Sequence, residues 1–509
     1  MKILMINSNL SIMPIPVMPY GLCMVAAALE KEGNEVKLLD LCFSNNIKRD
    51  IGDTIKDFQP GIIGVTVRNI DAAARIDAFF QLEQVKEKVI EPIKKVFTGP
   101  VIIGGPAVGI SGAEILGYFD LEYAVIGDGE AAMVEFADRI EKKKTLKGLK
   151  GLTWRKDGKI IEENPPWRIK ELNDLPRPNY KKYLDLEAYR KYKSTIQIQS
   201  KRGCALQCTY CTYKIIEGRE IRLRDPQLVA DEIERIYKET GFDYFEFTDS
   251  AFNVPLNHSK AVLKAIIEKK LDIKMRTMGL VPSALDEEYV DLLKQANFEE
   301  VELGIESGSD KMLKALGKNF KRNAIFRAAE LLGKVNIPAK WYLILGAPGE
   351  TIDTLMETFE TVKQAISKND FVIAFNGIRT YKGSAISEQF LEEKPGCTQD
   401  NFLRPVFYEP KSMNLDDIST FSYWMMLKYL PNGVIPERRQ NTSNFILKLQ
   451  NLIIMVFCPN LPWWKFYIFT NRLKKILGIN FLKRKILEFK NPHLFKNKKY
   501  KIKARKTSH

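Results

Sequence analysis

The first 160 residues alternate short apolar runs with segments of helical periodicity. The apolar runs predict strands over Lys2–Asn7, Glu35–Asp40, Ile62–Thr66, Val101–Gly104 and Tyr123–Ile126. The intervening pattern predicts helices over Tyr20–Glu32, which Gly33 is placed to cap, and over Ala72–Val89. Apolar strands separated by helices are typical of a parallel sheet that is covered on both faces. We therefore expect an α/β, doubly wound (Rossmann-like) domain over residues 1–162, closed by a hairpin around Asp157-Gly158.

Residues 163–192 break both patterns and indicate a linker, because four prolines interrupt them: Pro165, Pro166, Pro176 and Pro178. A second strand–helix series follows. Its strands are expected over Thr195–Gln199, Tyr244–Thr248, Ile273–Met278, Glu300–Gly304, Lys340–Leu345 and Val372–Phe375. Six βα units of this spacing predict a partial (β/α)6 or full barrel over residues 193–395, with its site on the loops after the strands. Residues 396–509 then form a basic and apolar, mainly helical C-terminal region.

Charge is distributed unevenly along the chain. The net charge is +15, yet residues 438–509 hold 18 Lys and Arg and a single acidic residue, an excess of +17. The rest therefore sums to −2 (15 − 17), and the long body shows no basic stripe of the kind that binds nucleic acid. Trp463, Trp464 and Phe466 precede Arg472, Lys474 and Lys475, a pattern that suits an anionic membrane surface. The alternative is a helical cap on the barrel with a solvated, Lys-rich end.

Cysteine usage favours a reduced, cytoplasmic compartment. The seven cysteines are scattered, and the apolar strand pattern at Met1–Asn7 lacks the features of a signal peptide. Three of them, Cys204, Cys208 and Cys211, share the loop that follows the first predicted barrel strand. Soft thiolates select iron–sulfur clusters, zinc or copper(I), and a closed zinc site needs a fourth protein ligand, which is not close in sequence. Three thiolates on one cluster would instead leave an iron open to a cofactor or substrate.

This cysteine spacing resembles the radical S-adenosylmethionine (SAM) superfamily, whose cluster-binding cysteines match Cys204, Cys208 and Cys211. The resemblance implies a [4Fe–4S] cluster whose open iron is chelated by SAM, and cleavage of SAM to a 5′-deoxyadenosyl radical. It also implies an external electron donor such as flavodoxin or ferredoxin. Tyr210, just before the last cysteine, would lie near the adenine of SAM; a packing role beneath the loop is the alternative.

The resemblance extends to other strand ends of the barrel. Asp249 or Thr248, after the second strand, is the candidate contact to the SAM amino group, although the family's common Gly-Gly-Glu is missing there. Glu306, after the fourth strand, would approach the ribose or the sulfonium, and Gly346 begins a loop like the one that flanks adenine. Each of these positions could equally serve the local structure. Arg219, Arg222, Arg224 and His258 are open to the same two interpretations.

A doubly wound domain ahead of such a barrel resembles the cobalamin-binding class of the superfamily. The strand-end glycines Gly104, Gly105, Gly127 and Gly129 would let a flat corrin approach the backbone. Many cobalamin domains ligate cobalt from below with a histidine of an Asp-x-His-x-x-Gly motif. The earliest histidine here is His258, so the lower face must be free, water-bound or approached by another side chain.

The resemblance makes methyl transfer to an unactivated carbon of a small-molecule or lipid-like substrate the leading interpretation, through the 5′-deoxyadenosyl radical and methylcobalamin. A non-methylating cyclase or rearrangement enzyme shares every motif quoted above. A non-catalytic protein that keeps the cluster or the cobalamin is the third hypothesis. The substrate itself is not legible in the sequence, and peripheral contact with the inner face of the membrane through the C-terminal region stays an expectation.

Overall fold

The computed structural model describes residues 1–12, 15–75, 79–430, 433–434, 474, 476–495 and 500, in which two seven-stranded sheets carry most of the chain. The front sheet has the order β2-β1-β3-β4-β5-β6-β7. Its strands are β1 (Lys2–Asn7), β2 (Glu35–Asp40), β3 (Ile62–Thr66), β4 (Val101–Gly104), β5 (Tyr123–Val125), β6 (Leu152–Lys156) and β7 (Lys159–Glu163). The first five are parallel and the last two form the expected antiparallel hairpin.

Helices cover both faces of the front sheet because its strands are apolar at successive positions. In β1, Ile3 and Met5 join the core beneath α1 (Tyr20–Lys31) and α6 (Gly129–Glu141). Leu4 and Ile6 face the opposite core, under α2 (Ile47–Phe58), α4 (Glu91–Val96) and α5 (Pro106–Phe119). This alternation is the two-residue period of a strand, and it confirms the doubly wound fold.

The predicted helix over Ala72–Val89 is wrong in its first half. Asp71 pairs with Phe80 in an isolated bridge, and among the described residues of this stretch the first helix is α3 (Gln81–Val85), followed by a π-helical turn at Lys86–Ile90. The Asp71 side chain accepts a hydrogen bond from the Ala73 amide at 2.8 Å, and Ala73 has a φ of +52°. A local side-chain bond of this kind competes with the helical one and turns the chain.

The linker is packed rather than extended. It contains α7 (Tyr180–Tyr183) and α8 (Leu186–Lys191), and three of its tyrosines, Tyr180, Tyr183 and Tyr189, are buried. The Tyr183 hydroxyl donates to Glu30 and the Tyr189 hydroxyl to Asp40, each at 2.6 Å. Prolines end the regular pattern here, and aromatic side chains hold the segment in place.

The second sheet is an open, all-parallel β/α partial barrel with the order β18-β15-β14-β13-β12-β11-β8. Its strands are β8 (Ile196–Ile198), β11 (Tyr244–Phe247), β12 (Lys274–Leu280), β13 (Phe298–Glu306), β14 (Ala339–Leu345), β15 (Phe371–Asn376) and β18 (Gly433–Val434). The outer helices are α10 (Pro226–Thr240), α11 (Leu256–Glu268), α12 (Glu287–Gln295), α14 (Arg322–Val335) and α15 (Ile352–Ala365). The six predicted strands all form, and β18 adds a seventh from beyond residue 395.

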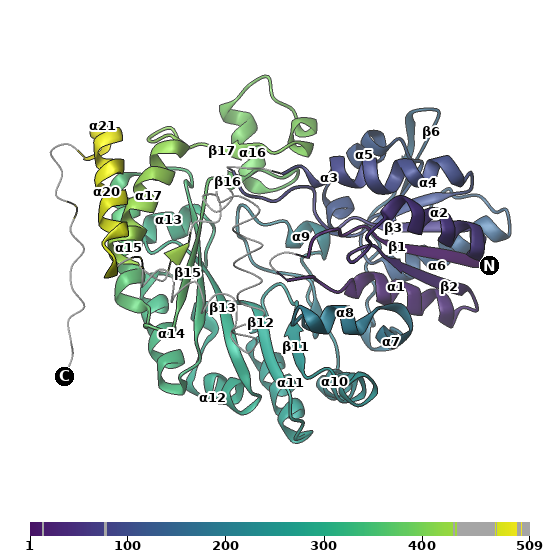
Figure 1. The fold of residues 1–509 in the computed structure, drawn as a ribbon, viewed down its shortest axis with the longest axis horizontal. Coiled ribbons are helices and arrows are strands. Elements are labelled where there is room, and N and C mark those ends of the chain that lie inside the picture. Colours follow the sequence, from purple (N-terminus) through teal and green to yellow (C-terminus); the bar gives the residue numbers. More distant parts are fainter. Residues whose placement is uncertain are drawn as a thin grey trace.

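Figure 1 shows the front domain and the barrel side by side, with the C-terminal helices at the far end of the barrel. There α17 (Leu415–Tyr429) packs against α20 (Ile479–Lys490), and α21 (Pro492–Phe495) follows α20. The Trp424 indole donates to Glu488 at 2.8 Å across that contact. The apolar stretch Phe445–Thr470, with Trp463, Trp464 and Phe466, lies outside the described residues. Within the described part of the chain, no helix has the length and apolarity needed to cross a bilayer.

Candidate functional site

The cysteine loop is held at both ends by a short antiparallel pair. β9 (Lys201–Arg202) pairs with β10 (Arg222–Leu223), and all three cysteines lie in the connection between them. Gly203, which begins this loop, has a φ of +94°, and a Cβ there would lie 1.9 Å from the Glu220 carbonyl oxygen. The Cys204 amide donates to the Gly218 carbonyl at 3.0 Å. Only glycine permits this closure, so the chain must bend into the loop just before the first cysteine.

The thiols of this loop suit a cluster better than a single metal ion. Cys204 and Cys208 are buried, Cys211 is partly exposed, and none of the three forms a disulfide. Among the described residues, no three His, Cys, Asp or Glu side chains are arranged around one ion position. A four-iron cluster bonds each cysteine to a different iron, so its thiols stand farther apart than the ligands of one ion. The donor set of three soft sulfurs therefore fits a [4Fe–4S] cluster with one open iron.

Tyr210, Glu306 and Lys318 form a polar group beside the cysteines. The Tyr210 hydroxyl donates to Glu306 Oε1 at 2.7 Å, and Lys318 Nζ donates to the same oxygen at 2.8 Å. Although burial disfavours the charged form of Lys318, the Glu306 carboxylate raises the pKa of this ammonium. Glu306 itself has a φ of +60°, which is unusual for a residue with a side chain. Sequence reasoning missed Lys318, which lies twelve residues after Glu306 in the loop before α14.

Asp249 anchors the start of the cysteine loop. Its carboxylate accepts from the Ser200 amide at 2.9 Å and from the Ser200 hydroxyl at 2.5 Å, and it is 2% exposed. Its neighbour Thr248 lies at the wall of the cavity described below. His258 is also buried against Ser200, whose carbonyl lies 3.2 Å from its Nε2. Asp249 and His258 thus hold the residue that connects β8 to β9.

Gly346 begins a loop that is held by a hydrogen bond to a residue of the same loop, Glu350. It has a φ of +98°, and its amide donates to Glu350 Oε2 at 3.1 Å. Burial raises the pKa of Glu350 to about 7, against the hydrogen bonds from Thr354 and the backbone, which lower it. Thr351 caps the N-terminus of α15 (Ile352–Ala365), with its side chain accepting from the Thr354 amide at 3.3 Å.

The front-domain glycines lie where the strands of its sheet end. Gly105 has a φ of +101°, and a Cβ there would meet Thr66 Oγ1 and the Val67 carbonyl at 2.8 Å. At Gly127 a Cβ would lie 2.4 Å from the carbonyl oxygen of Trp167, so this glycine makes room for the linker. Gly104, Gly105, Gly127 and Gly129 all line one cavity.

Four charged side chains join the front domain to the cysteine loop. Arg202 donates to Glu130 through both terminal nitrogens, at 2.5 and 3.2 Å, and lies 3.4 Å from Asp128. Arg222 forms a short ion pair with Asp128 and donates to the Ile169 carbonyl at 2.6 Å. All four are buried. We call Asp128, Glu130, Arg202 and Arg222 the interdomain clamp; it explains Arg222 as a structural residue. Arg224, likewise, pairs with Glu232.

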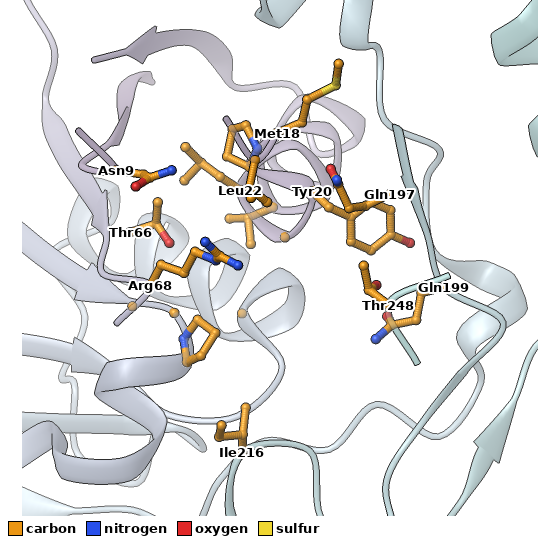
Figure 2. Close-up of a pocket in the computed structure, with 18 of the residues that line it drawn as sticks. Asn9, Met18, Tyr20, Leu22, Thr66, Arg68, Gln197, Gln199, Ile216 and Thr248 are labelled. Atoms are coloured by element: carbon orange, nitrogen blue, oxygen red, sulfur yellow. The ribbon is translucent and has the colours of Figure 1, made fainter. Parts of the chain in front are cut away.

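A cavity of about 630 Å³ lies between the two domains. Its walls combine the strand ends of the front sheet with the interior of the barrel, including Thr195, Gln197 and Gln199 before the cysteine loop. Figure 2 shows Arg68 and Thr66 on the front-domain side and Gln197, Gln199 and Thr248 on the barrel side. Arg68 lines the cavity and forms no ion pair with any described residue. Burial lowers the pKa of its guanidinium, against the attraction of Tyr213 and Glu246.

The fold and the site define a two-domain protein in which a strand-edge cofactor domain and a cysteine-bearing barrel share one chamber. Two family models match: the radical SAM superfamily over residues 198–362 and the B12 binding domain over residues 14–137. The chain thus belongs to the radical SAM superfamily, in the class that carries a B12-binding domain. It is an enzyme whose cofactors are a [4Fe–4S] cluster, SAM and cobalamin.

Similar proteins and structures agree with this assignment. An uncharacterized methyltransferase of Pyrococcus horikoshii is 26% identical over 70% of this chain and 75% of its own length. The tryptophan 2-C-methyltransferase of Streptomyces laurentii is 24% identical over 69% of this chain and 68% of its own. The radical SAM methyltransferase TsrM of Kitasatospora setae, solved with tryptophan and a SAM analogue, is 25% identical, with a TM-score of 0.72 over 77% of this chain and 76% of that one. Its form with cobalamin and a [4Fe–4S] cluster gives a TM-score of 0.81 over 97% and 99%, at 19% identity.

Proposed function

We propose that this enzyme transfers a methyl group from SAM, by way of cobalamin, to an unactivated carbon of a small-molecule substrate. The observation that carries the proposal is the shared cavity. Its walls include the four strand-end glycines of the B12-binding domain and barrel residues that lead into the cysteine loop. A small molecule in this cavity would therefore be within reach of both cofactor sites at once.

The cysteines and their neighbours are our candidates for holding the cluster and SAM. Cys204, Cys208 and Cys211 would ligate the cluster, because they are the three thiols of one glycine-bent loop. Tyr210 and Glu306, linked to each other and to Lys318, would contact SAM. Gly346 would contribute backbone to the same site, and Asp249 would position the loop through Ser200.

The front domain is our candidate for holding cobalamin. Gly104, Gly105, Gly127 and Gly129 line the cavity, and backbone without side chains is what a flat ring could approach closely. Arg68 would then be the side chain that meets cobalamin from the end of β3. A protonated guanidinium has no lone pair to donate to a metal. Arg68 would therefore offer a positive charge to cobalamin and not a ligand to its cobalt.

When bound, these cofactors supply a hydrogen-abstracting radical and a methyl group. The protein residues supply placement: the interdomain clamp fixes the cysteine loop against the B12-binding domain, and the cavity between the domains would receive the substrate. A clamp of buried, bidentate charge pairs holds its geometry better than a single contact does. Fixed placement of two cofactor sites on one chamber is what a methyl transfer requires.

The test is to follow the methyl group. We would reconstitute the protein anaerobically with iron, sulfide and cobalamin, add methyl-labelled SAM, reductant and a fractionated small-molecule extract, and analyse the products by mass spectrometry. Label in a carbon-bound methyl group supports the proposal. 5′-Deoxyadenosine formation with an unlabelled, cyclised or rearranged product would support the alternative enzyme class; anaerobic magnesium-protoporphyrin monomethyl ester cyclases are also among the relatives, with 29% identity over 43% of this chain in Synechocystis.

We also propose two interactions of the whole protein. The first is with an external electron donor such as flavodoxin or ferredoxin, since the cluster must be reduced. The second is peripheral contact with an anionic membrane through α20, which exposes Phe481 (57%), Leu482 (62%) and Phe489 (86%) beside Lys483 and Lys485. Sedimentation with phosphatidylglycerol vesicles, compared with neutral phosphatidylcholine vesicles, tests it. Equal partitioning of the Phe489→Ser variant and the unmodified protein would argue against the contact. No feature of the described body favours nucleic acid.

A further inference from the structure

Lys318 lies beside the cysteine loop because the two residues before it contact that loop directly. The Thr209 amide donates to the Leu316 carbonyl at 3.1 Å. Gly317 has a φ of +70°, and a Cβ there would lie 2.4 Å from the Gln207 carbonyl oxygen. Only glycine permits so close an approach of two backbone segments at a positive φ. The turn that carries Lys318 is therefore fixed against the loop that carries the three cysteines.

The side chain of Lys318 is buried and hydrogen-bonded. Its ammonium donates to Glu306 Oε1 at 2.8 Å and to the Gly304 carbonyl at 3.0 Å, and the side chain is 9% exposed. Its nitrogen also lies 5.6 Å from the centre of the Tyr210 ring, within the range of a cation–π contact. A buried ammonium is costly unless it is paired with an opposite charge and hydrogen-bonded. Lys318 and Glu306 meet both conditions and form a buried ion pair.

This ion pair stands next to two of the three proposed cluster ligands. Tyr210, whose hydroxyl donates to Glu306, lies in the chain between Cys208 and Cys211. The two charges of the pair act on a thiol in opposite directions. Burial raises the pKa of Cys208, an effect that Lys318 opposes and Glu306 increases. Each charge is therefore close enough to change the electrostatic potential where the cluster would be bound.

The effect of each charge on the cluster follows from the electron that the cluster must accept. Reduction by an external donor adds one negative charge to the cluster, and net charge is one of the quantities that set its potential. A carboxylate beside the cluster makes that electron harder to add, and an ammonium makes it easier. Glu306 alone would therefore lower the reduction potential of the cluster, and Lys318 would offset that effect.

We infer that Lys318 is a positioning residue that holds the Glu306 carboxylate beside the cluster and offsets its charge, so that the carboxylate does not lower the reduction potential of the cluster. The inference rests on the proposed function for the assignment of the cysteines as cluster ligands. It adds a residue that acts electrostatically, through Glu306. With Lys318 in place, the proposed SAM site can contain an acidic side chain next to a cluster that has to be reduced.

The reduction potential of the cluster tests this inference without turnover. We would load the protein with cluster and cobalamin, leave out SAM, reduce it stepwise with titanium(III) citrate near pH 8, and follow the EPR signal of the reduced cluster. We expect Lys318→Met to lower the equilibrium constant for reduction about tenfold, which is about 59 mV for one electron. We expect Glu306→Gln, which leaves the ammonium without its counter-charge, to raise that constant by about the same factor.

Opposite shifts distinguish an electrostatic role from a structural one, because a general disturbance of the loop would move both potentials in the same direction. The double variant Lys318→Met/Glu306→Gln has neither charge, and its equilibrium constant should return to within about twofold of the value for the unmodified protein. Lys318→Arg keeps the charge and should keep the potential. Lys334→Met removes a half-exposed lysine that pairs with Glu287; it is the matched control and should leave the potential unchanged.

Three results would contradict the inference. The first is a shift of the same sign, or no shift, in the two single variants. The second is an unchanged potential together with weaker SAM binding in Lys318→Met, which would make Lys318 a direct contact of SAM. The third applies if Lys318→Met does not retain its cluster, because Glu306→Gln then decides alone: a higher potential supports the inference, and an unchanged one overturns it.

The two proposals can fail separately. Labelled methyl transfer by a protein whose cluster potential responds to neither variant would leave the proposed function standing and overturn the role of Lys318. Opposite shifts of the potential, together with an unmethylated product, would do the reverse.

Discussion

Arg202 and Glu130 are linked by two hydrogen bonds, at 2.5 and 3.2 Å, that cross from the cysteine-bearing barrel to the B12-binding domain. Both side chains are buried, and Arg202 is reached a second time by Asp128 at 3.4 Å. The glycine-rich loop at residues 127–130, which the sequence suggested only as a corrin-binding loop, thus also contacts the barrel. Its acidic residues hold the strand that begins the cysteine loop.

We predict that Glu130→Ala lowers the free energy of unfolding by about 3 kcal/mol, because it leaves Arg202 buried without its bidentate partner. Urea unfolding of the loaded enzyme measures the change. Glu239→Ala removes an exposed carboxylate that pairs with Arg235 on one helix, and should cost about 0.5 kcal/mol or less. An equal decrease in the free energy of unfolding for the two variants would mean that the interdomain clamp stabilises the protein no more than an exposed ion pair does.

Removing one thiol of the cysteine loop should abolish cluster chemistry. We expect Cys208→Ala to lose iron–sulfur absorption and to form no 5′-deoxyadenosine under strong reductant, since a cluster with fewer ligands is not retained. The control is Cys397→Ala, which changes an exposed cysteine elsewhere in the chain. Reductive SAM cleavage by the Cys208→Ala protein would refute the assignment of the cluster.

Gly105 allows the proposed cobalamin site to be tested with a substitution that adds one methyl group and no charge. Gly105→Ala must fit a Cβ 2.8 Å from Thr66 Oγ1 and from the Val67 carbonyl, at a φ of +101° and a ψ of 177° that only glycine adopts readily. We expect a loss of about 1–3 kcal/mol in stability and a reduced cobalamin content after reconstitution, read from visible absorbance. Gly117→Ala, in the same helix with no atom within 4 Å of the new Cβ, should load normally and gain up to about 1 kcal/mol.

Glu350 should make stability depend on pH. Its folded pKa of about 7 lies above the unfolded value of 4.5, so between these values the folded protein holds the extra proton. Stability therefore falls as pH rises through this window, by about 3 kcal/mol in all, and is level above it. In Glu350→Gln the side chain cannot ionise, and this contribution should vanish. Comparing unfolding free energies of both proteins near pH 5 and near pH 8 gives the difference; parallel profiles would contradict the assignment.

Most of the framework was predictable because it depends on local patterns. The runs at Lys2–Asn7 and Ile62–Thr66 are strands to the residue, since uniform apolarity between helices leaves few alternatives. Gly33 does adopt a left-handed conformation after α1, with a φ of +81°. The helix expected from Ala72 is wrong in its first half because the Asp71 side chain accepts from the Ala73 amide, and the same carboxylate is held by Arg379, which lies 308 residues away. No window of sequence contains that contact.

Only those residues of the candidate site that belong to a recognisable sequence motif could be predicted. The cysteine spacing indicated the loop, but Lys318 and Arg68 belong to no pattern and are identified only by what they face. One charged residue of the barrel interior left a signal in the sequence that could have been used. Glu246 is the one charge in the aromatic strand β11, and a charge in a buried strand needs a partner or a purpose.

The ion pair between Asp71 and Arg379 also bears on how the chamber is made during protein synthesis. It is fully buried, with a separation of 2.7 Å, and ties the loop after β3 to the segment after β15. At the usual speed of translation, roughly 15 to 60 s pass between the appearance of the two residues. The B12-binding domain is therefore synthesised long before the wall that completes its chamber. A nascent chain has only a half-open cofactor cleft, and the enclosed space exists only after the ribosome has made nearly the whole barrel.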